Sequence, residues 1–255
     1  MAGKLKVDVV IPVYNEQRIL ESSIDTLRTF LLENFSKYDW KIIIANNASK
    51  DNTLEIAKRI TRKHKDVQLV HLDQKGRGRA LKKAWLSSKA DIVSYMDVDL
   101  STELSAFPKM IEGMLAGKCN VATGTRLTKQ SNTIRRLFRE VLSRGYNYII
   151  RAVLWVHYSD AQCGFKAVTR KGLKDLVPLI KDNEWFFDTE LLTLAEKFGY
   201  GIYELPIKWV EDKDSRVSIA KTIYQYLRDV TRLRLDLWFR KELKALKSKS
   251  RAAEA

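Results

Sequence analysis

Short apolar runs alternate with amphipathic segments through the first hundred residues. Four runs rich in aliphatic and β-branched residues predict buried strands, at residues 5–13, 40–45, 67–72 and 91–96. Three segments between them place apolar side chains at helical spacing, at residues 16–32, 51–62 and 78–88. Strands and helices that alternate at this length predict β-α-β units. We therefore expect an α/β fold with a mostly parallel sheet and helices on both faces.

The second half of the chain is less regular. Its pattern predicts three further helices, at residues 104–115, 132–156 and 187–198, of which the second is long, basic and aromatic. It also predicts a strand at residues 119–126, a strand or loop at residues 163–170, and a late strand at residues 200–210. Because Pro206 lacks a backbone N–H, we expect this late strand at the edge of the sheet. Residues 1–212 are expected to form this α/β domain.

Residues 217–246 predict a long amphipathic helix. Its apolar stripe consists of Ile219, Ile223, Leu227, Val230, Leu233 and Leu237. Its other face carries Lys221, Arg228, Arg232, Arg240, Lys241, Lys244 and Lys247. We therefore expect residues 213–255 to form a basic helical tail whose last residues are disordered.

Polar side chains follow each of the four predicted N-terminal strands. They lie in residues 14–16, 46–51, 73–79 and 97–102. In open parallel sheets, ligands bind beyond the carboxyl ends of the strands. We therefore expect these four loops to converge on one crevice.

Two aspartates, Asp97 and Asp99, stand one residue apart at the end of the fourth strand. On an extended strand their carboxylates point to opposite sides, whereas a turn brings both toward one cation. Mg2+ and Mn2+ prefer oxygen ligands and commonly retain substrate phosphates. The pair therefore predicts a divalent ion that holds a diphosphate. The alternative is a strand end whose aspartate caps the next helix.

Charge narrows the class of partner. The 255 residues include 46 Lys and Arg against 31 Asp and Glu, a formal net charge of +15. This surplus predicts an anionic partner: nucleic acid, phospholipid headgroups or a phosphorylated substrate. Two distant cysteines, Cys119 and Cys163, supply neither a disulfide framework nor a cysteine metal motif. Residues 76–79, GRGR, lack the spacing of a P-loop or a dinucleotide-binding loop, which disfavours both classes of enzyme.

Seven segments of the chain, in order, resemble the family 2 glycosyltransferases with the GT-A fold. The first four are VIPVYNE, ANNASKDNT, KGRGRALKKAW and MDVDLS. The last three are DAQCGFKAVTR, WFFDTELLTLAEKFGYGIYELPIKWVED and DSRVS. These later segments resemble the dolichyl-phosphate glucose and mannose synthases, and are closer to the glucosyl type. The resemblance covers residues 7–218.

The resemblance implies roles for individual residues. The implied catalytic residues are Asp97 and Asp99, which would hold Mg2+ or Mn2+, Arg126 for phosphate charge, Asp188 and Glu190 beside the acceptor, and Arg216 for a phosphate. Asn46 and Asn47 replace the Asp-Asp or Asp-Asn that the family usually has near the base, and an amide that both donates and accepts is compatible with uracil. The other implied substrate-binding residues are Pro12, Tyr14, Asn15, Glu16, Lys75, Gly76, Arg77, Val98 and Gly164.

By resemblance, the reaction moves a hexose from a nucleoside diphosphate to dolichyl or another polyprenyl phosphate, with inversion at the anomeric carbon. UDP-glucose is the favoured donor and GDP-mannose the alternative. A phosphate monoester needs little help from a general base, because its second pKa is about 6. It does need cations that offset the repulsion between two anionic substrates. The candidates are Arg135, Arg136, Arg139, Arg144 and Arg216.

A polyprenyl substrate has to be met at a bilayer, and the basic amphipathic helix of residues 217–249 suits a helix that lies in the membrane surface. The alternative is a helix docked on the sheet with its basic face exposed. The N-terminal residues do not resemble a signal peptide. The uncharged stretch at residues 152–159 is far shorter than the roughly 20 residues of a membrane span. We therefore expect a peripheral protein on the cytoplasmic face of a membrane, alone or with a separate membrane-protein partner.

Three other functions are compatible with parts of the pattern. A nucleic-acid-binding protein would explain the charge, but aromatic and basic residues are not interleaved and no recognised nucleic-acid motif is present. A nucleotidyltransferase also combines an α/β sheet with a metal-bound diphosphate. A soluble glycosyltransferase would act on a saccharide or a protein. We expect no nucleic-acid partner, and binding to anionic vesicles separates the membrane enzyme from the last two alternatives.

Overall fold

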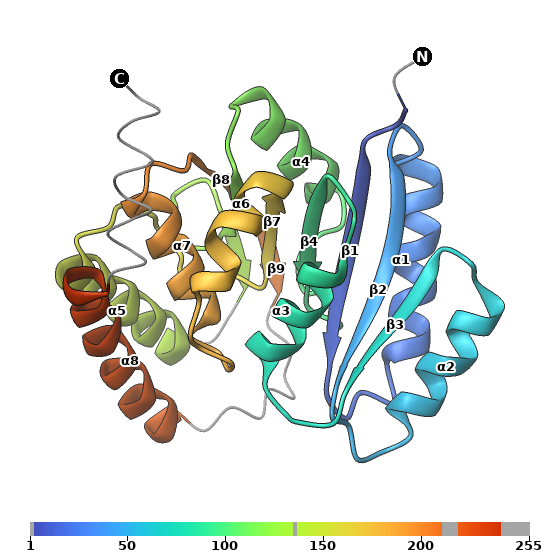
Figure 1. Cartoon of the computed structure of the whole chain (residues 1–255), viewed down its shortest axis with the longest axis horizontal. Helices are drawn as coiled ribbons and strands as arrows, with labels where there is room; N and C mark the ends of the chain where they lie inside the picture. The colour runs from blue at the N-terminus through green and yellow to red at the C-terminus, as the bar shows by residue number, and fades with distance from the viewer. Residues whose placement is uncertain (1–2, 135–136, 211–218, 241–255) are drawn as a thin grey trace.

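The structure, a computed structural model, describes residues 3–134, 137–210 and 219–240. In this part of the chain, seven strands form one sheet in the order β3-β2-β1-β4-β7-β5-β8, and two short strands pair separately (Figure 1). Their bounds are β1 Lys6–Val13, β2 Asp39–Asn47, β3 Val67–Leu72, β4 Ile92–Met96, β5 Val121–Thr125, β6 Asn132–Ile134, β7 Phe165–Thr169, β8 Ile202–Pro206 and β9 Lys208–Val210. Within the large sheet, β7 runs antiparallel to its two neighbours and the other pairs are parallel. The predicted α/β fold with a mostly parallel sheet is confirmed.

Helices cover both faces of the large sheet (Figure 1). Their bounds are α1 Leu20–Asn34, α2 Thr53–Lys63, α3 Arg77–Ser87, α4 Ala106–Ala116, α5 Leu137–Leu154, α6 Arg170–Leu176, the short 3-10 helix η1 Val177–Leu179, α7 Phe187–Lys197 and α8 Ile219–Phe239. Strand β1 shows why two layers form, because Val9 and Ile11 pack with α1 while Val10 packs on the opposite side. Alternate side chains of a strand point to opposite faces, so each face acquires its own apolar core.

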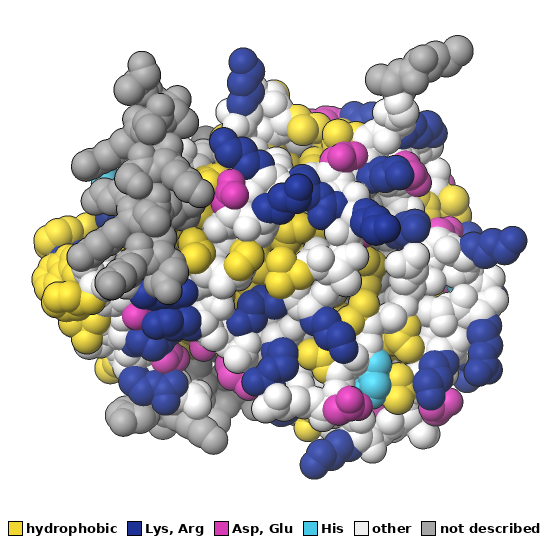
Figure 2. Space-filling model, viewed as in Figure 1, with side chains coloured by type: hydrophobic (Ala, Val, Ile, Leu, Met, Phe, Trp, Pro, Cys, Tyr) yellow, Lys and Arg dark blue, Asp and Glu magenta, His cyan; other side chains and the backbone are white. Residues whose placement is uncertain are grey.

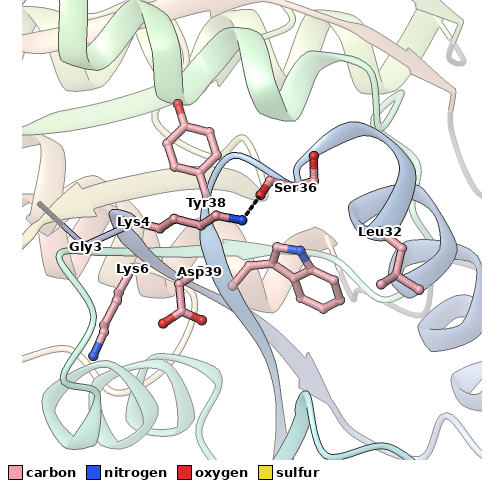
Figure 3. A pocket seen from close by; sticks show the side chains of 8 residues that line it. Gly3, Lys4, Lys6, Leu32, Ser36, Tyr38 and Asp39 are labelled. Carbon is pink, nitrogen blue, oxygen red and sulfur yellow. Dashed lines mark hydrogen bonds between the residues drawn. The ribbon is translucent and has the colours of Figure 1, made fainter. Parts of the chain in front are cut away.

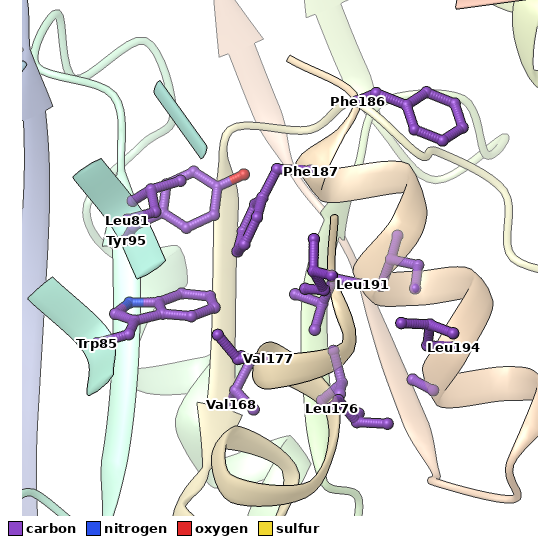
Figure 4. Close-up of a cluster of buried hydrophobic side chains, with 14 of the residues drawn as sticks. Leu81, Trp85, Tyr95, Val168, Leu176, Val177, Phe186, Phe187, Leu191 and Leu194 are labelled. Carbon is purple, nitrogen blue, oxygen red and sulfur yellow. The ribbon is translucent and has the colours of Figure 1, made fainter. Parts of the chain in front are cut away.

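The core on the α3 side contains a cluster of aromatic rings centred on Trp85. Trp85 of α3 lies 5.9 Å from Tyr95 of β4 and 5.7 Å from Phe187 of α7, measured between ring centroids (Figure 4). All three rings are fully buried. They fix α3 and α7 against the end of β4, where the two aspartates follow.

The region of residues 132–156 differs from its prediction as one helix. Residues Asn132–Ile134 form strand β6, which pairs in parallel with β9, and α5 begins only at Leu137. The Thr133 hydroxyl also donates to the Arg126 carbonyl oxygen over 3.0 Å. Pairing with a distant segment therefore overrides the local helical pattern. Pro206 does end an edge strand, β8, as predicted.

Helix α8 packs against the protein with part of its apolar stripe. Val230 and Leu233 are buried, and the Tyr226 ring lies 4.6 Å from the Tyr146 ring of α5. These side chains are therefore covered by protein, as in the alternative of a docked helix. The side chains of Ile219 and Ile223, and all of residues 241–255, lie outside the described part of the chain.

A hollow of about 510 Å³ lies at the edge of the sheet where β1 and β2 begin (Figure 3). Its lining includes Lys4, Tyr38, Asp39 and Trp40, and the Lys4 ammonium donates to the Ser36 carbonyl oxygen. It lies at the opposite end of these strands from the loops that carry the predicted site residues.

Candidate active site

The loops that follow β1, β2 and β3 lie side by side. Pro12 and Val13 of β1 align with Ala45 and Asn46 of β2, and Asn47 aligns with Leu72 of β3. Parallel neighbours in register bring their carboxyl ends to one edge of the sheet. The convergence of these loops is confirmed.

The loops after β1 and β2 are joined by hydrogen bonds from backbone N–H groups of one loop to side-chain oxygens of the other. Asn15, with φ 57°, donates its N–H to the Ser49 hydroxyl over 3.0 Å, and its carboxamide oxygen accepts from Lys50 N–H over 2.8 Å. The Glu16 N–H donates to the Thr53 hydroxyl over 2.8 Å. These contacts join the loop that carries Tyr14 and Glu16 to the loop after β2.

Both predicted base-binding asparagines bond within the protein. The Asn46 amide nitrogen lies 3.0 Å from His71 Nδ1, its oxygen accepts from Ser49 N–H, and the side chain is fully buried. The Asn47 oxygen accepts from Gly76 N–H over 2.6 Å. An aspartate at position 46 would lack the donor for His71 Nδ1. Asn47 therefore ties the end of β2 to the third loop, and Asn46 ties it to strand β3.

Residues 76–79 form the start of α3 and contact the loop of Asn183 and Glu184. Gly76 has φ +154°, and a Cβ there would lie 2.6 Å from the Asn183 carbonyl oxygen. The N–H groups of Gly78 and Arg79 donate to the carbonyl oxygens of Glu184 and Asn183, over 3.1 Å and 3.0 Å. Protein carbonyls thus occupy these first-turn donors, which in a P-loop would bind phosphate. Just before the helix, the Lys75 ammonium lies 3.8 Å from the Tyr14 ring centroid.

Arg77 is the buried centre of the site. Its guanidinium donates to Asp97 over 2.7 Å and to Asp188 over 3.0 Å. It also lies 4.9 Å from the ring centroids of both Tyr95 and Trp185. Burial by itself lowers the pKa of Arg77, but Asp97 and the other nearby acids outweigh it and raise that pKa well above its usual value. The guanidinium is therefore a permanent cation that fixes the Asp97 carboxylate.

Asp97 also faces a glycine on a separate element. A Cβ built at Gly164, just before β7, would lie 1.8 Å from Asp97 Oδ2. The chain then turns, since Leu100 N–H donates to the Asp97 carbonyl oxygen over 3.1 Å and Leu100 has φ 51°. Val98 is buried within this turn, whereas the side chain of Asp99 is exposed and accepts from Ser101 N–H. Strand β4 therefore ends at Met96, and the chain turns at Asp97, as a cation shared by the two aspartates would require.

The donor set fits a hard divalent cation that shares its ligands with a substrate. Asp97 and Asp99 offer carboxylate oxygens, which Mg2+ and Mn2+ prefer. Among residues 3–134, 137–210 and 219–240, no group of three or more His, Cys, Asp or Glu side chains forms a complete metal site. A cation at these two aspartates would thus need oxygens from a bound diphosphate or water.

Arg126 lies at the end of β5 in a buried ion pair. Its Nε and Nη2 donate to Asp160 over 2.7 Å and 3.0 Å, and Asp160 is fully buried. Burial alone would raise the pKa of Asp160, but Arg126 outweighs it and lowers that pKa below its ordinary value. The positive charge of Arg126 is therefore compensated within the protein. This arrangement limits what Arg126 offers to a phosphate.

Asp188 and Glu190 point in different directions from α7. Asp188 bonds to Arg77 and accepts from the Tyr95 hydroxyl, and its carboxylate lies 3.4 Å from the Lys166 ammonium. Glu190 instead contacts Arg232 of α8. The structure brings Asp188 to the Asp97 cluster and places Glu190 on the other side of the helix.

Of the arginines predicted to contact the acceptor, Arg139 and Arg144 are described, and both lie on α5. Arg144 on α5 is exposed and pairs with Glu140 over 2.5 Å, and Arg139 lies one turn earlier on the same helix. Arg135, Arg136 and Arg216 lie outside the described part of the chain.

Three buried residues with polar groups in the site were not predicted from the sequence. They are Tyr95 and Lys166, which contact Asp188, and Asp160, which pairs with Arg126. Lys166 is fully buried, and its ammonium donates to the carbonyl oxygens of Cys163 over 2.6 Å and Ala161 over 3.3 Å. It thus supports the backbone that presents Gly164 to Asp97. The available signal was a lysine inside the apolar run Phe165–Thr169, because buried lysines are rare unless paired.

Residues 8–177 match the profile described as Glycosyl transferase family 2. The chain is 35% identical to "Glycosyltransferase AglD" of Haloferax volcanii over 87% of its own length, but spans only 36% of that protein. It is 30% identical to "Dolichyl-phosphate beta-glucosyltransferase" of Dictyostelium discoideum, over 91% of this chain and 76% of that one. The human protein of the same name is 26% identical, over 90% and 75%.

Solved structures share the fold. The glucosyl-3-phosphoglycerate synthase of Mycobacterium tuberculosis in complex with UDP superimposes with a TM-score of 0.67. The two chains are 19% identical, over 92% of this chain and 80% of that one. The complex of that enzyme with Mn2+, UDP and glucosyl-3-phosphoglycerate gives a TM-score of 0.65. In the chain as described, no helix is long and apolar enough to cross a membrane.

Proposed function

We propose that this chain, which belongs to glycosyl transferase family 2 and is therefore a glycosyltransferase, moves glucose from UDP-glucose to dolichyl or a related polyprenyl phosphate. The relatives named dolichyl-phosphate beta-glucosyltransferase support the sugar and the acceptor, since the chain spans about three quarters of them. The same proposal places the reaction at a membrane surface, where the acceptor resides.

One observation carries the assignment to the residues of the site. Asp97 is fixed from two sides, by Arg77 from α3 and by the Gly164 backbone before β7, at the point where β4 ends in a turn. We assign Asp97 and Asp99 as the residues that hold Mg2+ or Mn2+. The cation, when bound, stabilises the negative charge that develops on the leaving diphosphate.

The donor nucleotide is assigned to the edge formed by the first three loops. Tyr14 and Lys75 lie against each other there and offer a ring face and a cation. Glu16, Asn15 and Asn47 are expected to shape this pocket, with Asn46 acting through His71 and the second loop. In this assignment the asparagines support the base pocket without direct contact by Asn46.

Asp188 is assigned a positioning role in place of base catalysis. Its carboxylate contacts Arg77, Tyr95 and Lys166, and only 4% of the side chain is exposed. A carboxylate occupied by three partners is poorly placed to accept a proton from an acceptor. No general base is needed when the acceptor is a phosphate monoester, because its second ionisation has a pKa of about 6. Asp188 instead holds Arg77 in place beside Asp97.

The surface assigned to the membrane is formed by α5 together with α8. Residues of α5 and its end expose large apolar side chains, namely Leu137, Phe138, Val141, Tyr148, Ile149, Val153 and Trp155. Trp238 and Phe239 of α8 are also exposed, and Arg234 lies 3.7 Å from the Trp155 ring and 4.6 Å from the Trp238 ring. Figure 2 shows hydrophobic side chains gathered at the left edge over these two helices. Apolar and basic residues together suit an anionic bilayer surface.

A donor screen tests the proposed function. UDP-glucose, GDP-mannose and UDP-N-acetylglucosamine are each offered to the purified chain with Mn2+, a short polyprenyl phosphate and detergent, and lipid-linked sugar is measured. We expect product from UDP-glucose and little from the other two donors. Transfer to a soluble saccharide with no lipid-linked product would contradict the assignment of the acceptor.

A further inference from the structure

Glu190 is a fully buried carboxylate whose two oxygens bind protein groups on both sides. Its Oε1 accepts from Lys181 N–H over 3.1 Å, and its Oε2 accepts from Asp182 N–H over 2.9 Å. The Arg232 guanidinium of α8 donates to both oxygens over 3.3 Å. Glu190 therefore joins the loop of residues 181–185 to the C-terminal helix.

The loop of residues 181–185 is held at several further points. The Lys181 ammonium pairs with Asp236 of α8 over 2.8 Å, and Asp182 Oδ1 accepts from Glu184 N–H over 2.7 Å. Three of the contacts that fix this loop, those of Lys181 N–H, Asp182 N–H and the Lys181 ammonium, thus involve α8 or a carboxylate that α8 touches. Its backbone conformation depends on α8 being docked.

The same loop packs against the first turn of α3. Its carbonyl oxygens at Asn183 and Glu184 accept from the first N–H groups of the helix. A Cβ at Gly78 would lie 2.8 Å from Phe187 Cβ and 3.0 Å from the Asn183 backbone, so the two segments are in close contact. Arg77 directly precedes Gly78 in the chain, and Trp185 from the loop lies against its guanidinium. A shift of the loop therefore has to move Arg77.

We propose that Glu190, together with Arg232, is a positioning residue that keeps Arg77 on Asp97 through the loop of residues 181–185. Helix α8 is then part of the machinery that prepares the cation site, in addition to any contact with the membrane. The inference rests on the proposed function in one respect, since the consequence for sugar transfer requires Asp97 to hold the cation. The structural link between Glu190 and α3 does not depend on that.

Hydrogen exchange tests the structural link. In Glu190→Gln the side chain keeps its size, but its amide nitrogen faces a backbone N–H that has lost its acceptor. We expect the amides of Gly78 and Arg79 to exchange about tenfold faster, as the loss of one buried hydrogen-bond acceptor typically allows. Arg232→Gln should have the same effect, and the double variant should exceed neither single variant, because the pair acts as one unit.

The matched control is Asp66→Asn, which breaks the partly buried pair of Asp66 with Arg28 on the α1 side of the sheet. It should leave exchange at Gly78 and Arg79 unchanged. Unchanged exchange in Glu190→Gln, or an increase of equal size in β1 and in α3, would overturn the inference, since the second result indicates general destabilisation.

Metal-activation kinetics test the consequence for the reaction. With the full chain, Glu190→Gln should raise the Mn2+ concentration needed for half-maximal sugar transfer about tenfold, more than it raises KM for the polyprenyl phosphate. Glu190→Asp, which keeps the charge, should restore part of the difference. An unchanged Mn2+ requirement alongside faster exchange would overturn the role in positioning Asp97. Failure of the unmodified chain to transfer sugar would instead reject the proposed function, and the exchange result would stand by itself.

Discussion

At the residue scale, the site depends on polar side chains that are paired before any substrate binds. The pairs of Arg77 with Asp188 and of Arg126 with Asp160 are buried, and Arg77 also pairs with the partly exposed Asp97. Such pairs contribute little net stability, but removal of one partner leaves a costly uncompensated charge. Their value here lies in geometry, because each fixes the direction of a carboxylate or guanidinium.

Gly164 offers the sharpest single substitution. In Gly164→Ala the new Cβ would meet the Asp97 carboxylate, so Asp97 has to move away from its position. We expect sugar transfer to fall about 100-fold, as a displacement of about 1 Å can cause, while the melting temperature changes little. Gly145→Ala is the matched control, because nothing lies within 4 Å of a Cβ at that position. Equal activity of the two variants would count against the placement of Asp97 at the centre of the site.

The buried pair of Arg126 and Asp160 makes a pH-dependent contribution to stability. The pKa of Asp160 is lowered in the folded protein, so the stabilisation is present above the ordinary pKa of about 3.9 and is lost as pH falls through the folded value. Asp160→Asn should lower the free energy of unfolding by about 3 kcal/mol at pH 7, since Arg126 is left buried without its counter-charge. Urea unfolding from pH 7 to pH 3 should show this difference shrinking in acid. A difference independent of pH would exclude the ion pair as its cause.

At the scale of elements, α5 and α8 combine two roles. Their facing sides pack together through Tyr146, Tyr226, Val230 and Leu233. Their outer sides expose apolar side chains with arginines beside them. The helical periodicity of α8 was visible in the sequence, but it did not reveal that part of the stripe is covered by protein.

The outer side of α5 gives a prediction at this scale. Phe138 is 63% exposed, so Phe138→Glu should leave the fold intact. It should weaken binding to anionic vesicles about tenfold or more, because one aromatic side chain no longer inserts into the bilayer. Leu86→Glu on α3 is the control, since Leu86 is 50% exposed away from α5 and α8. Co-sedimentation with vesicles measures both variants. Equal binding by both would remove α5 from the membrane-facing surface.

At the scale of the whole molecule, the first hundred residues were predicted well because local periodicity and the rules for parallel sheets determine them. The position of Asp97 and of the neighbouring loops followed from the ends of β1 to β4. Strand β6 was missed because its partner, β9, lies far along the chain. The partners of Asn46, Arg126 and Glu190 could not be predicted either, since side-chain direction on packed elements decides them.

The central claim is that a divalent cation held by Asp97 and Asp99 is required for sugar transfer. It is tested most directly by measuring glucosyl transfer to a polyprenyl phosphate in excess EDTA, and again after Mn2+ is restored, for the unmodified chain and for Asp97→Asn. The account predicts that EDTA abolishes transfer by the unmodified chain, that Mn2+ restores it, and that Asp97→Asn stays inactive in a folded state. Undiminished transfer in EDTA, or full activity of Asp97→Asn, would contradict it.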